Sequence, residues 1–164
     1  MTRYLSALAA YLMLQSGVAS AAARPAADPV DRFTHARVDD AANILVPFGP
    51  RIGRMADSFG TDLGIDVHVV TSIDGRTPIE TQATSTFEKR QVARKAPTGG
   101  LLVILDPGVG SARIEVGYSL EGVMTDLHMS RVARDQLAPY VSYGSAGMAV
   151  MDVMHYLRDF ALIA

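Results

Sequence analysis

The chain has 164 residues, of which 49% are hydrophobic and 20% are charged, and its formal net charge is −2. This composition is typical of a globular domain, and a near-neutral charge gives no attraction to nucleic acid or to anionic membranes. The sequence contains no Cys, which excludes disulfides, thiolate zinc sites, cysteine nucleophiles and a lipoprotein anchor. We therefore expect no nucleic-acid partner, and a fold that is stabilised by packing alone.

The first 23 residues have the order of a secretory signal sequence. Arg3 precedes an apolar run from Tyr4 to Leu14, and two small-x-small cleavage motifs follow within residues 19–23. The apolar run spans only about 16 Å as a helix, too short for a bilayer core of ~30 Å. We expect residues 1–23 to be cleaved on export to the periplasm or the medium; an uncleaved N-terminal anchor is the alternative. Residues 24–36, rich in Pro, Ala and Asp, are predicted to be a flexible arm before one domain, residues 37–164.

The first half of this domain predicts one helix on each side of a strand. After a short opening segment, residues 38–45, apolar residues recur every three or four positions from Ile52 to Leu63, which predicts an amphipathic helix that ends at Gly64. Residues 65–70 alternate between apolar and polar, as in a strand. The run Thr77-Pro78-Ile79-Glu80 has the pattern of a capping box with Pro at the first helical position, and predicts a second helix from there.

The second half predicts two strands and then two helices. Residues 101–105 are apolar on both faces, as in a central strand, and a turn at 106–111 leads to an alternating strand over 113–118. Helices are predicted over 125–138, ended by Pro139, and over 145–162. Strand–helix–strand order implies a right-handed parallel crossover, and strand–turn–strand implies a hairpin. We therefore predict a three-layer α/β/α sandwich with a small mixed sheet.

The predicted hairpin brings two distant segments to one rim of the sheet, because its midpoint lies near Gly110. Residues 98–100 would then face residues 119–121, which predicts a shallow polar pocket. Its residues would be Thr98, Gly99, Gly100, Ser119 and Glu121.

Carboxylates near this rim predict a site for a hard divalent cation such as Ca²⁺. The candidate ligands are Glu121 and Asp126. Thr125 and Asp126 also suit the N-cap and first turn of a helix, so capping is the alternative role for this pair.

Other polar and sulfur-bearing residues give weaker indications. His128 is the one histidine near the predicted pocket, and no Arg or Lys is convincingly placed to clamp a phosphate, since Arg131 lies about one and a half turns past Asp126. The sequence has no HExxH, GxSxG, Walker or GxGxxG motif. Three methionines spaced by three on the last helix predict core packing, or a contact surface if they are exposed. They are Met148, Met151 and Met154.

Several segments together resemble the TPM-domain family over about residues 37–163. The most specific is Ile114–Asp126, IEVGYSLEGVMTD; the others are residues 38–45, 64–71 and 99–105. The resemblance implies an exported or lumenal α/β/α domain, and functions among acid phosphatase activity, calcium binding, and the assembly or repair of membrane complexes such as photosystem II. Many relatives continue into a C-terminal transmembrane helix, whereas this sequence ends at Ala164. We therefore expect a soluble domain without a membrane span after signal cleavage.

Two departures from the family pattern bear on function. The family typically has Asp-Asn-Gly where this chain has Thr98-Gly99-Gly100, and Ser119 replaces a usual Gly. The missing aspartate belongs to the acidic residues that the resemblance connects with metal binding or catalysis. Its loss leaves Glu121 and Asp126, joined by Asp40 if its segment reaches the same rim. We therefore expect a binding or accessory module for envelope protein complexes that binds a divalent cation. The alternative is a metal-assisted acid phosphatase, with Glu121 and Asp126 as metal ligands, water as nucleophile and no identified catalytic side chain.

Overall fold

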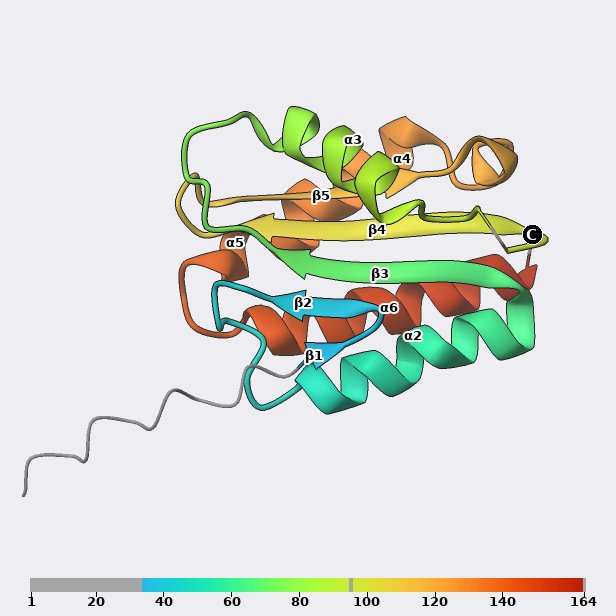
Figure 1. Ribbon diagram of the computed structural model, residues 1–164, viewed down its shortest axis with the longest axis horizontal. Coiled ribbons are helices and arrows are strands. Elements are labelled where there is room, and N and C mark those ends of the chain that lie inside the picture. The colour runs from blue at the N-terminus through green and yellow to red at the C-terminus, as the bar shows by residue number, and fades with distance from the viewer. Residues whose placement is uncertain (1–33, 95, 164) are drawn as a thin grey trace, which may run out of the picture. The chain divides into compact units, whose positions relative to one another are not determined.

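A computed structural model describes residues 34–94 and 96–163, and its centre is a five-stranded mixed sheet (Figure 1). The strands are β1 (Thr34–His35), β2 (Val38–Asp40), β3 (Ile65–Thr71), β4 (Gly99–Asp106) and β5 (Ser111–Val116). They lie side by side in chain order. β2, β3 and β4 are parallel to one another, while β1 and β5 are antiparallel edge strands.

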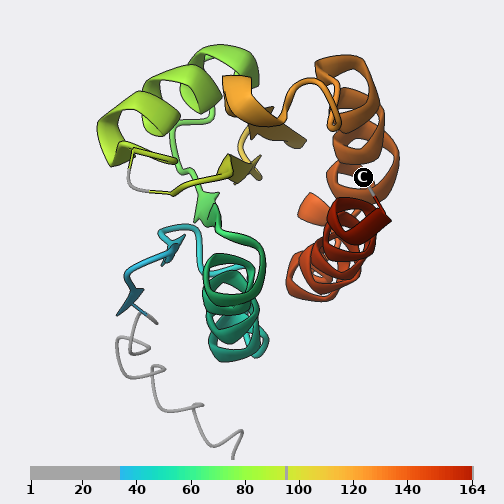
Figure 2. The same ribbon diagram turned by 90° about the vertical axis from the view of Figure 1, so that its right-hand side faces the viewer.

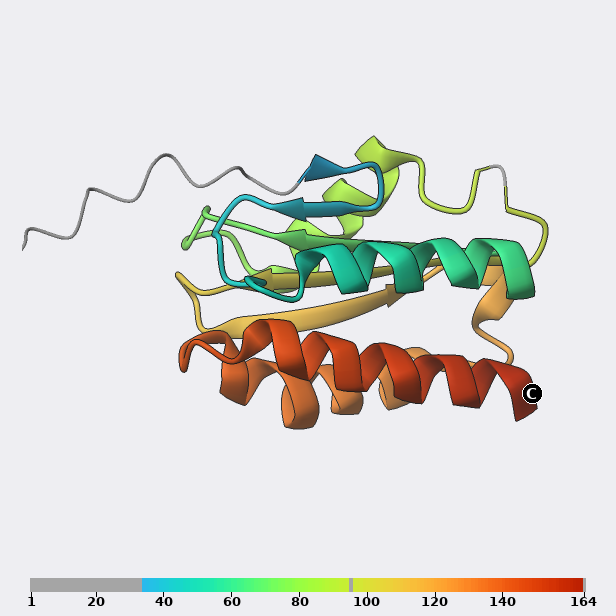
Figure 3. The same ribbon diagram turned by 90° about the horizontal axis from the view of Figure 1, so that it is seen from below.

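Helices cover both faces of this sheet, which confirms the predicted three-layer α/β/α fold. They are α2 (Gly49–Leu63), α3 (Ile79–Arg90), a 3₁₀ turn η1 (Tyr118–Leu120), α4 (Asp126–Val132), a π-helical turn η2 (Ala133–Leu137), α5 (Ala138–Val141) and α6 (Ala146–Ile163). Among the described residues, the larger core lies between one face of the sheet and α2, α4, η2, α5 and α6, whereas α3 packs on the other face (Figures 2 and 3). Every residue of β4 is buried, as expected of a strand that is covered on both faces.

The two parallel crossovers use opposite faces of the sheet. β2–α2–β3 and β3–α3–β4 each move one strand in the same direction, but Ile52 of α2 belongs to the larger core and Ile79 of α3 to the smaller one. Two such connections must have opposite hands, so one of them departs from the right-handed rule. As a consequence, α2 and α3 both end near the start of β3 and β4, on opposite faces, and leave space between their ends.

The helix boundaries agree with the local signals, but one cap differs. Gly64 has φ 67° and ends α2, as its missing Cβ allows. α3 begins at the predicted place, but its N-cap is Pro78 and no side chain caps it. Thr77 instead contributes its carbonyl oxygen, which accepts a hydrogen bond from Gln82 Nε2 at 2.7 Å. The predicted capping box is therefore not formed.

The helical segment after residue 125 does not end at Pro139, contrary to the prediction. Proline in a regular α-helix clashes with the carbonyl four residues earlier and lacks an N–H donor. Here the π turn η2 comes immediately before α5, and Pro139 occupies the first turn of α5. The wider turn accommodates the ring, so the chain stays helical to Val141.

The start of the domain also differs from the prediction. The sequence predicts an arm over residues 24–36, but Thr34 and His35 form β1, paired antiparallel with β2. The opening segment contributes β2 itself, and β5 ends at Val116 rather than at residue 118. Strands of two or three residues carry too little alternation to be recognised. The predicted signal sequence and most of the arm lie outside the described residues. Within the described part, no helix combines the length and apolarity needed to cross a membrane.

Candidate functional site

The structure brings the two predicted rim segments into direct contact at Gly99. This residue has φ 138°, and a Cβ at its position would lie 2.4 Å from Ser119 Oγ and 2.8 Å from Leu120 Cγ. The N–H of Gly117 donates to the carbonyl oxygen of Gly100 at 2.8 Å, which extends the β4–β5 contact to the rim. The segments therefore pack against each other so closely that even a methyl group does not fit between them.

Thr98 points toward α2 rather than toward Ser119. Its hydroxyl donates to the carbonyl oxygen of Leu63 at 2.9 Å, and its N–H donates to that of Gly64 at 3.2 Å. These bonds join the start of β4 to the end of α2. Thr98, which stands where the family typically has an aspartate, therefore links β4 to the end of α2.

Asp126 lies in the first turn of α4, five residues after Glu121, which is exposed and follows η1. One Asp126 oxygen accepts a hydrogen bond from Arg113 Nη2 at 2.7 Å, and its side chain is 66% exposed. Burial lowers the pKa of Arg113. The hydrogen bond to Glu115 and the charges of Asp126, Glu115 and Glu80 raise it by more than burial lowers it, so the pKa lies above its ordinary value. Asp126 therefore already neutralises a cation of β5.

Thr125 has the capping role that was the alternative to ligand binding. Its hydroxyl oxygen accepts a hydrogen bond from the N–H of His128 at 3.4 Å. The His128 ring points to the last helix, where Nε2 lies 2.5 Å from Tyr156 Oη and the ring stacks on Phe160 at a centroid distance of 5.3 Å. His128 thus joins α4 to α6 by packing.

Asp40 lies at the opposite end of the sheet from Glu121. It pairs in register with Thr71, which pairs with Leu105, whereas Gly99 at the other end of β4 contacts the segment before Glu121. Six residues of strand separate these ends, about 20 Å. The structure therefore does not bring Asp40 to Glu121 and Asp126. Among the residues described, no group of three or more His, Cys, Asp or Glu side chains is arranged to hold a metal ion.

The Asp40 carboxylate is instead satisfied by its own loop. It is 7% exposed and accepts hydrogen bonds from the N–H groups of Ile44 and Leu45, both at 3.0 Å, and from the Thr71 hydroxyl at 2.8 Å. Three donors satisfy this buried carboxylate, which holds the β2–α2 loop against β3.

Three exposed apolar side chains lie within six sequence positions of Glu121. Tyr118 is 90% exposed, Leu127 65% and Val123 40%; we call these three residues the apolar rim surface. All three lie in or next to the segment Ile114–Asp126 that carries the family resemblance. Of the three methionines of α6, by contrast, Met151 and Met154 are buried and only Met148 is half exposed, so that helix mainly serves the core.

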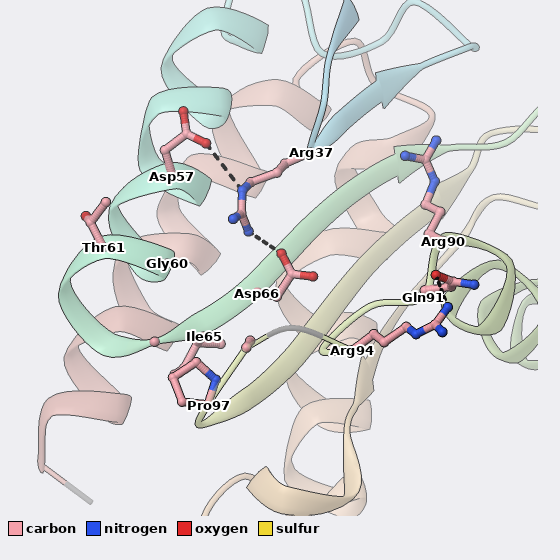
Figure 4. Close-up of a pocket in the computed structure, with 12 residues that line it drawn as sticks. Arg37, Asp57, Gly60, Thr61, Ile65, Asp66, Arg90, Gln91, Arg94 and Pro97 are labelled. Atoms are coloured by element: carbon pink, nitrogen blue, oxygen red, sulfur yellow. Dashed lines mark hydrogen bonds and ion pairs between the residues drawn. The ribbon is translucent and has the colours of Figure 1, made fainter.

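A second feature lies at the same end of the molecule and was not predicted. A pocket of about 630 Å³ opens between the end of α2, the start of β3 and the α3–β4 loop (Figure 4). Its charged lining comes from three separate parts of the chain. We call it the arginine pocket, after Arg37, Arg90 and Arg94; Asp57 and Asp66 also line it.

Ion pairs fix one side of the arginine pocket more firmly than the other. Arg37 Nε lies 3.3 Å from Asp57, and Arg37 Nη1 also pairs with Asp66, so this guanidinium bridges α2 and β3. Arg90 pairs with Asp39, whose side chain is 52% exposed. Arg94 donates to the neutral Gln91 side chain at 2.7 Å.

Asp66 connects this pocket to a half-buried histidine. Its second oxygen lies 3.3 Å from His68 Nε2 and accepts the Ala93 N–H at 3.2 Å. Burial lowers the pKa of His68, Asp66 raises it, and the charges of Arg90 and Arg37 lower it, with a net decrease. His68 Nδ1 is buried without a hydrogen-bond partner among the described residues.

Sequence reasoning missed these arginines because nothing local marks them. More than 50 positions separate Arg37 from Arg90 in the chain, and neither belongs to a motif. The available signal was topological: Arg37 precedes β2, Arg90 is the last residue of α3, and Arg94 follows that helix. Only the position of the two helix ends brings them together.

Comparison with known proteins agrees with the resemblance seen in the sequence. The profile of the TPM domain matches residues 38–160. The solution structure of the N-terminal domain of a Porphyromonas gingivalis protein has a TM-score of 0.62 and 25% identity, covering 73% of this chain and 80% of that one. The N-terminal domain of cg2496 from Corynebacterium glutamicum (TM-score 0.52, 17% identity, 76% and 78% covered) shares the fold.

One curated relative is much longer. ATP synthase subunit alpha 3 of Paraburkholderia xenovorans is 30% identical over 122 residues, which are 71% of this chain but 23% of that protein. The chain thus spans less than a quarter of that relative. The profile match, by contrast, spans well over half of this chain, which therefore belongs to the TPM domain family.

Proposed function

We propose that this TPM domain is an exported binding module that contacts a protein of an envelope complex through its apolar rim surface. The observation that carries the proposal is the 90% exposure of Tyr118, with Leu127 and Val123 exposed nearby in the chain. Tyrosine is enriched among the residues that dominate binding energy at protein interfaces, since it supplies a large rigid surface and a polar group.

The condition of the carboxylates predicted as metal ligands supports binding over turnover. Asp40 is buried and occupied by three donors, and Asp126 pairs with Arg113. A metal-assisted hydrolase needs ligands and a nucleophile that converge on one point. Of the three predicted carboxylates, Glu121 and Asp126 are open to solvent.

A divalent cation is part of the proposal. Glu121 and Asp126 are both exposed, and Ca²⁺ accepts carboxylates, backbone carbonyls and water in a flexible shell. Two carboxylates predict weak binding that water must complete. If the same cation activated water, the domain would hydrolyse phosphomonoesters, which is the second candidate function.

A capture experiment tests the proposed surface. The purified protein is immobilised and exposed to envelope extract, beside the double variant Tyr118→Ser/Leu127→Ser. The matched control is Tyr143→Ser, because Tyr143 is 84% exposed but lies in the loop before α6. We expect a defined partner to be retained by the wild type and the control and lost from the double variant. Equal retention by all three proteins would refute the apolar rim surface as the binding site.

Turnover and export are tested separately. Steady release of phosphate from p-nitrophenyl phosphate, abolished by Asp126→Asn, would replace the binding module with the enzyme. N-terminal sequencing of the protein recovered from the periplasm or medium tests export. A first residue between Ala22 and Arg24 is the expected result, and an intact N-terminus at Met1 would contradict cleavage.

A further inference from the structure

We infer that the arginine pocket receives an acidic segment of the partner protein, whose carboxylates pair with Arg90 and Arg94. The inference rests on the proposed function and adds the chemistry of the partner. It starts from position: Pro97 lines the pocket, and two residues later Gly99 packs against Ser119 and Leu120 beside the apolar rim surface. A partner bound at the rim therefore has this pocket within reach.

The charges of the pocket are divided between its two sides. Asp57 on α2 and Asp66 on β3 are both engaged by Arg37, which stays fixed between them (Figure 4). Arg90 and Arg94 lie on the α3 side. Arg94 has only the neutral Gln91 as its described partner, and the exposed Arg90–Asp39 pair can exchange partners at little cost. Two guanidiniums are therefore available to an incoming anion.

The backbone that presents Arg94 is strained. Gln91 has φ 53° and Ala93 has φ 71°, left-handed values that non-glycine residues rarely adopt. The strain is maintained because Val92 is buried and the Ala93 N–H donates to Asp66 at 3.2 Å. Strained turns of this kind cluster at binding sites, where the surrounding structure holds them for a purpose other than stability.

Size and charge favour an acidic peptide over a single small anion. About 630 Å³ is the volume of a site for a drug-sized ligand or a short peptide, much more than one ion needs. A compact dianion placed centrally would also meet the carboxylates of Asp57 and Asp66. An extended segment can place its carboxylates on Arg90 and Arg94 and keep them away from the two aspartates.

The probe for this inference is a fluorescein-labelled hexaglutamate peptide, with hexaglutamine as the neutral control. Binding is measured by fluorescence anisotropy at low salt, against the wild type, Arg90→Gln and Arg94→Gln. Arg51→Gln is the matched variant, since Arg51 is exposed at the start of α2 and does not line the pocket. Arg94 is also exposed, so its replacement leaves the fold intact, which circular dichroism verifies.

We expect saturable binding of hexaglutamate that weakens about tenfold in Arg90→Gln and in Arg94→Gln, as for the loss of one charge-assisted contact. Arg51→Gln should bind hexaglutamate as tightly as the wild type does. Hexaglutamine should not bind. Equal affinity for all three arginine variants, or no binding to the wild type, overturns the inference. So does inorganic phosphate that binds in an Arg94-dependent way and displaces the peptide, because the pocket would then be a small-anion site.

The two proposals fail independently. Tyr118→Ser/Leu127→Ser should bind hexaglutamate as the wild type does, because neither residue lines the pocket. If that variant loses partner capture and the wild type does not bind hexaglutamate, the apolar rim surface remains supported and the inference of an acidic segment is refuted. The opposite pattern would leave the pocket and remove the rim.

Discussion

Replacing Gly99 with alanine should destabilise the protein by an amount that the rim geometry sets. The φ of 138° is disfavoured for any residue with a side chain, at roughly 1–2 kcal/mol. The new Cβ would also lie 2.4 Å from Ser119 Oγ and 2.8 Å from Leu120 Cγ. Overpacking of this kind costs about 1–3 kcal/mol. The expected total is therefore about 2–5 kcal/mol in the free energy of unfolding.

A double-mutant cycle separates these two causes. Ser119→Gly removes the oxygen that makes the shorter contact but leaves the Leu120 contact and the backbone strain unchanged. In the double variant Gly99→Ala/Ser119→Gly we expect roughly 1 kcal/mol to be recovered relative to the sum of the single effects. A recovery of the whole loss would mean that backbone strain contributes nothing.

The assay is equilibrium unfolding in urea, followed by circular dichroism at fixed pH and salt. Gly122→Ala is the matched control, because Gly122 has a φ that alanine accepts. Apart from Gly122 and its two chain neighbours, no heavy atom of the described residues lies within 4 Å of the place that the alanine methyl carbon would take. It should stay within about 0.5 kcal/mol of the wild type. If Gly99→Ala were equally neutral, or showed no coupling to Ser119, the packing described at the rim would be wrong.

Three further predictions concern the remaining polar groups. Asp40→Ala leaves the buried N–H of Leu45 and the part-buried N–H of Ile44 without an acceptor, and should lower the free energy of unfolding by about 2–4 kcal/mol in the same urea assay; a loss under 0.5 kcal/mol would contradict its role as the anchor of the β2–α2 loop. His68 has a pKa below its ordinary value of 6.5, so its contribution to stability is complete above that value and is lost as pH falls through the folded pKa; wild type should lose more stability than His68→Gln between pH 7 and pH 5, and parallel curves would refute this. Millimolar Ca²⁺ should raise the melting temperature of the wild type but not of Glu121→Gln/Asp126→Asn, while an equal shift in both proteins would place the ion elsewhere.

Local sequence features predicted the layers of the fold. The unbroken apolar run of residues 101–105 identified the central strand, because a strand covered on both faces has no polar side. The spacing from Ile52 to Leu63 and the glycine at position 64 identified α2 and its end. Where the prediction failed, at β1, at β2 and at Pro139, the elements are short or depend on a π turn, which leaves no periodic pattern.

The candidate site was predicted only in part. The hairpin centred near Gly110 implied that Gly99 meets Ser119, and the structure places them together. The family resemblance grouped Asp40 with Glu121 and Asp126, but no pattern fixed the position of its segment in the sheet. Its pairing with Thr71 puts it at the other end.

By itself, the sequence determined the family, the fold class and the helix and strand that each apolar pattern requires. These follow from short-range regularities, because burial of one face repeats along the chain every two or every 3.6 residues. The tertiary structure alone decided which polar side chains meet. Arg37 and Arg94 share a pocket because α2 and α3 pass over opposite faces of the sheet and both end near the starts of β3 and β4. That arrangement depends on contacts between distant elements, which no local pattern records.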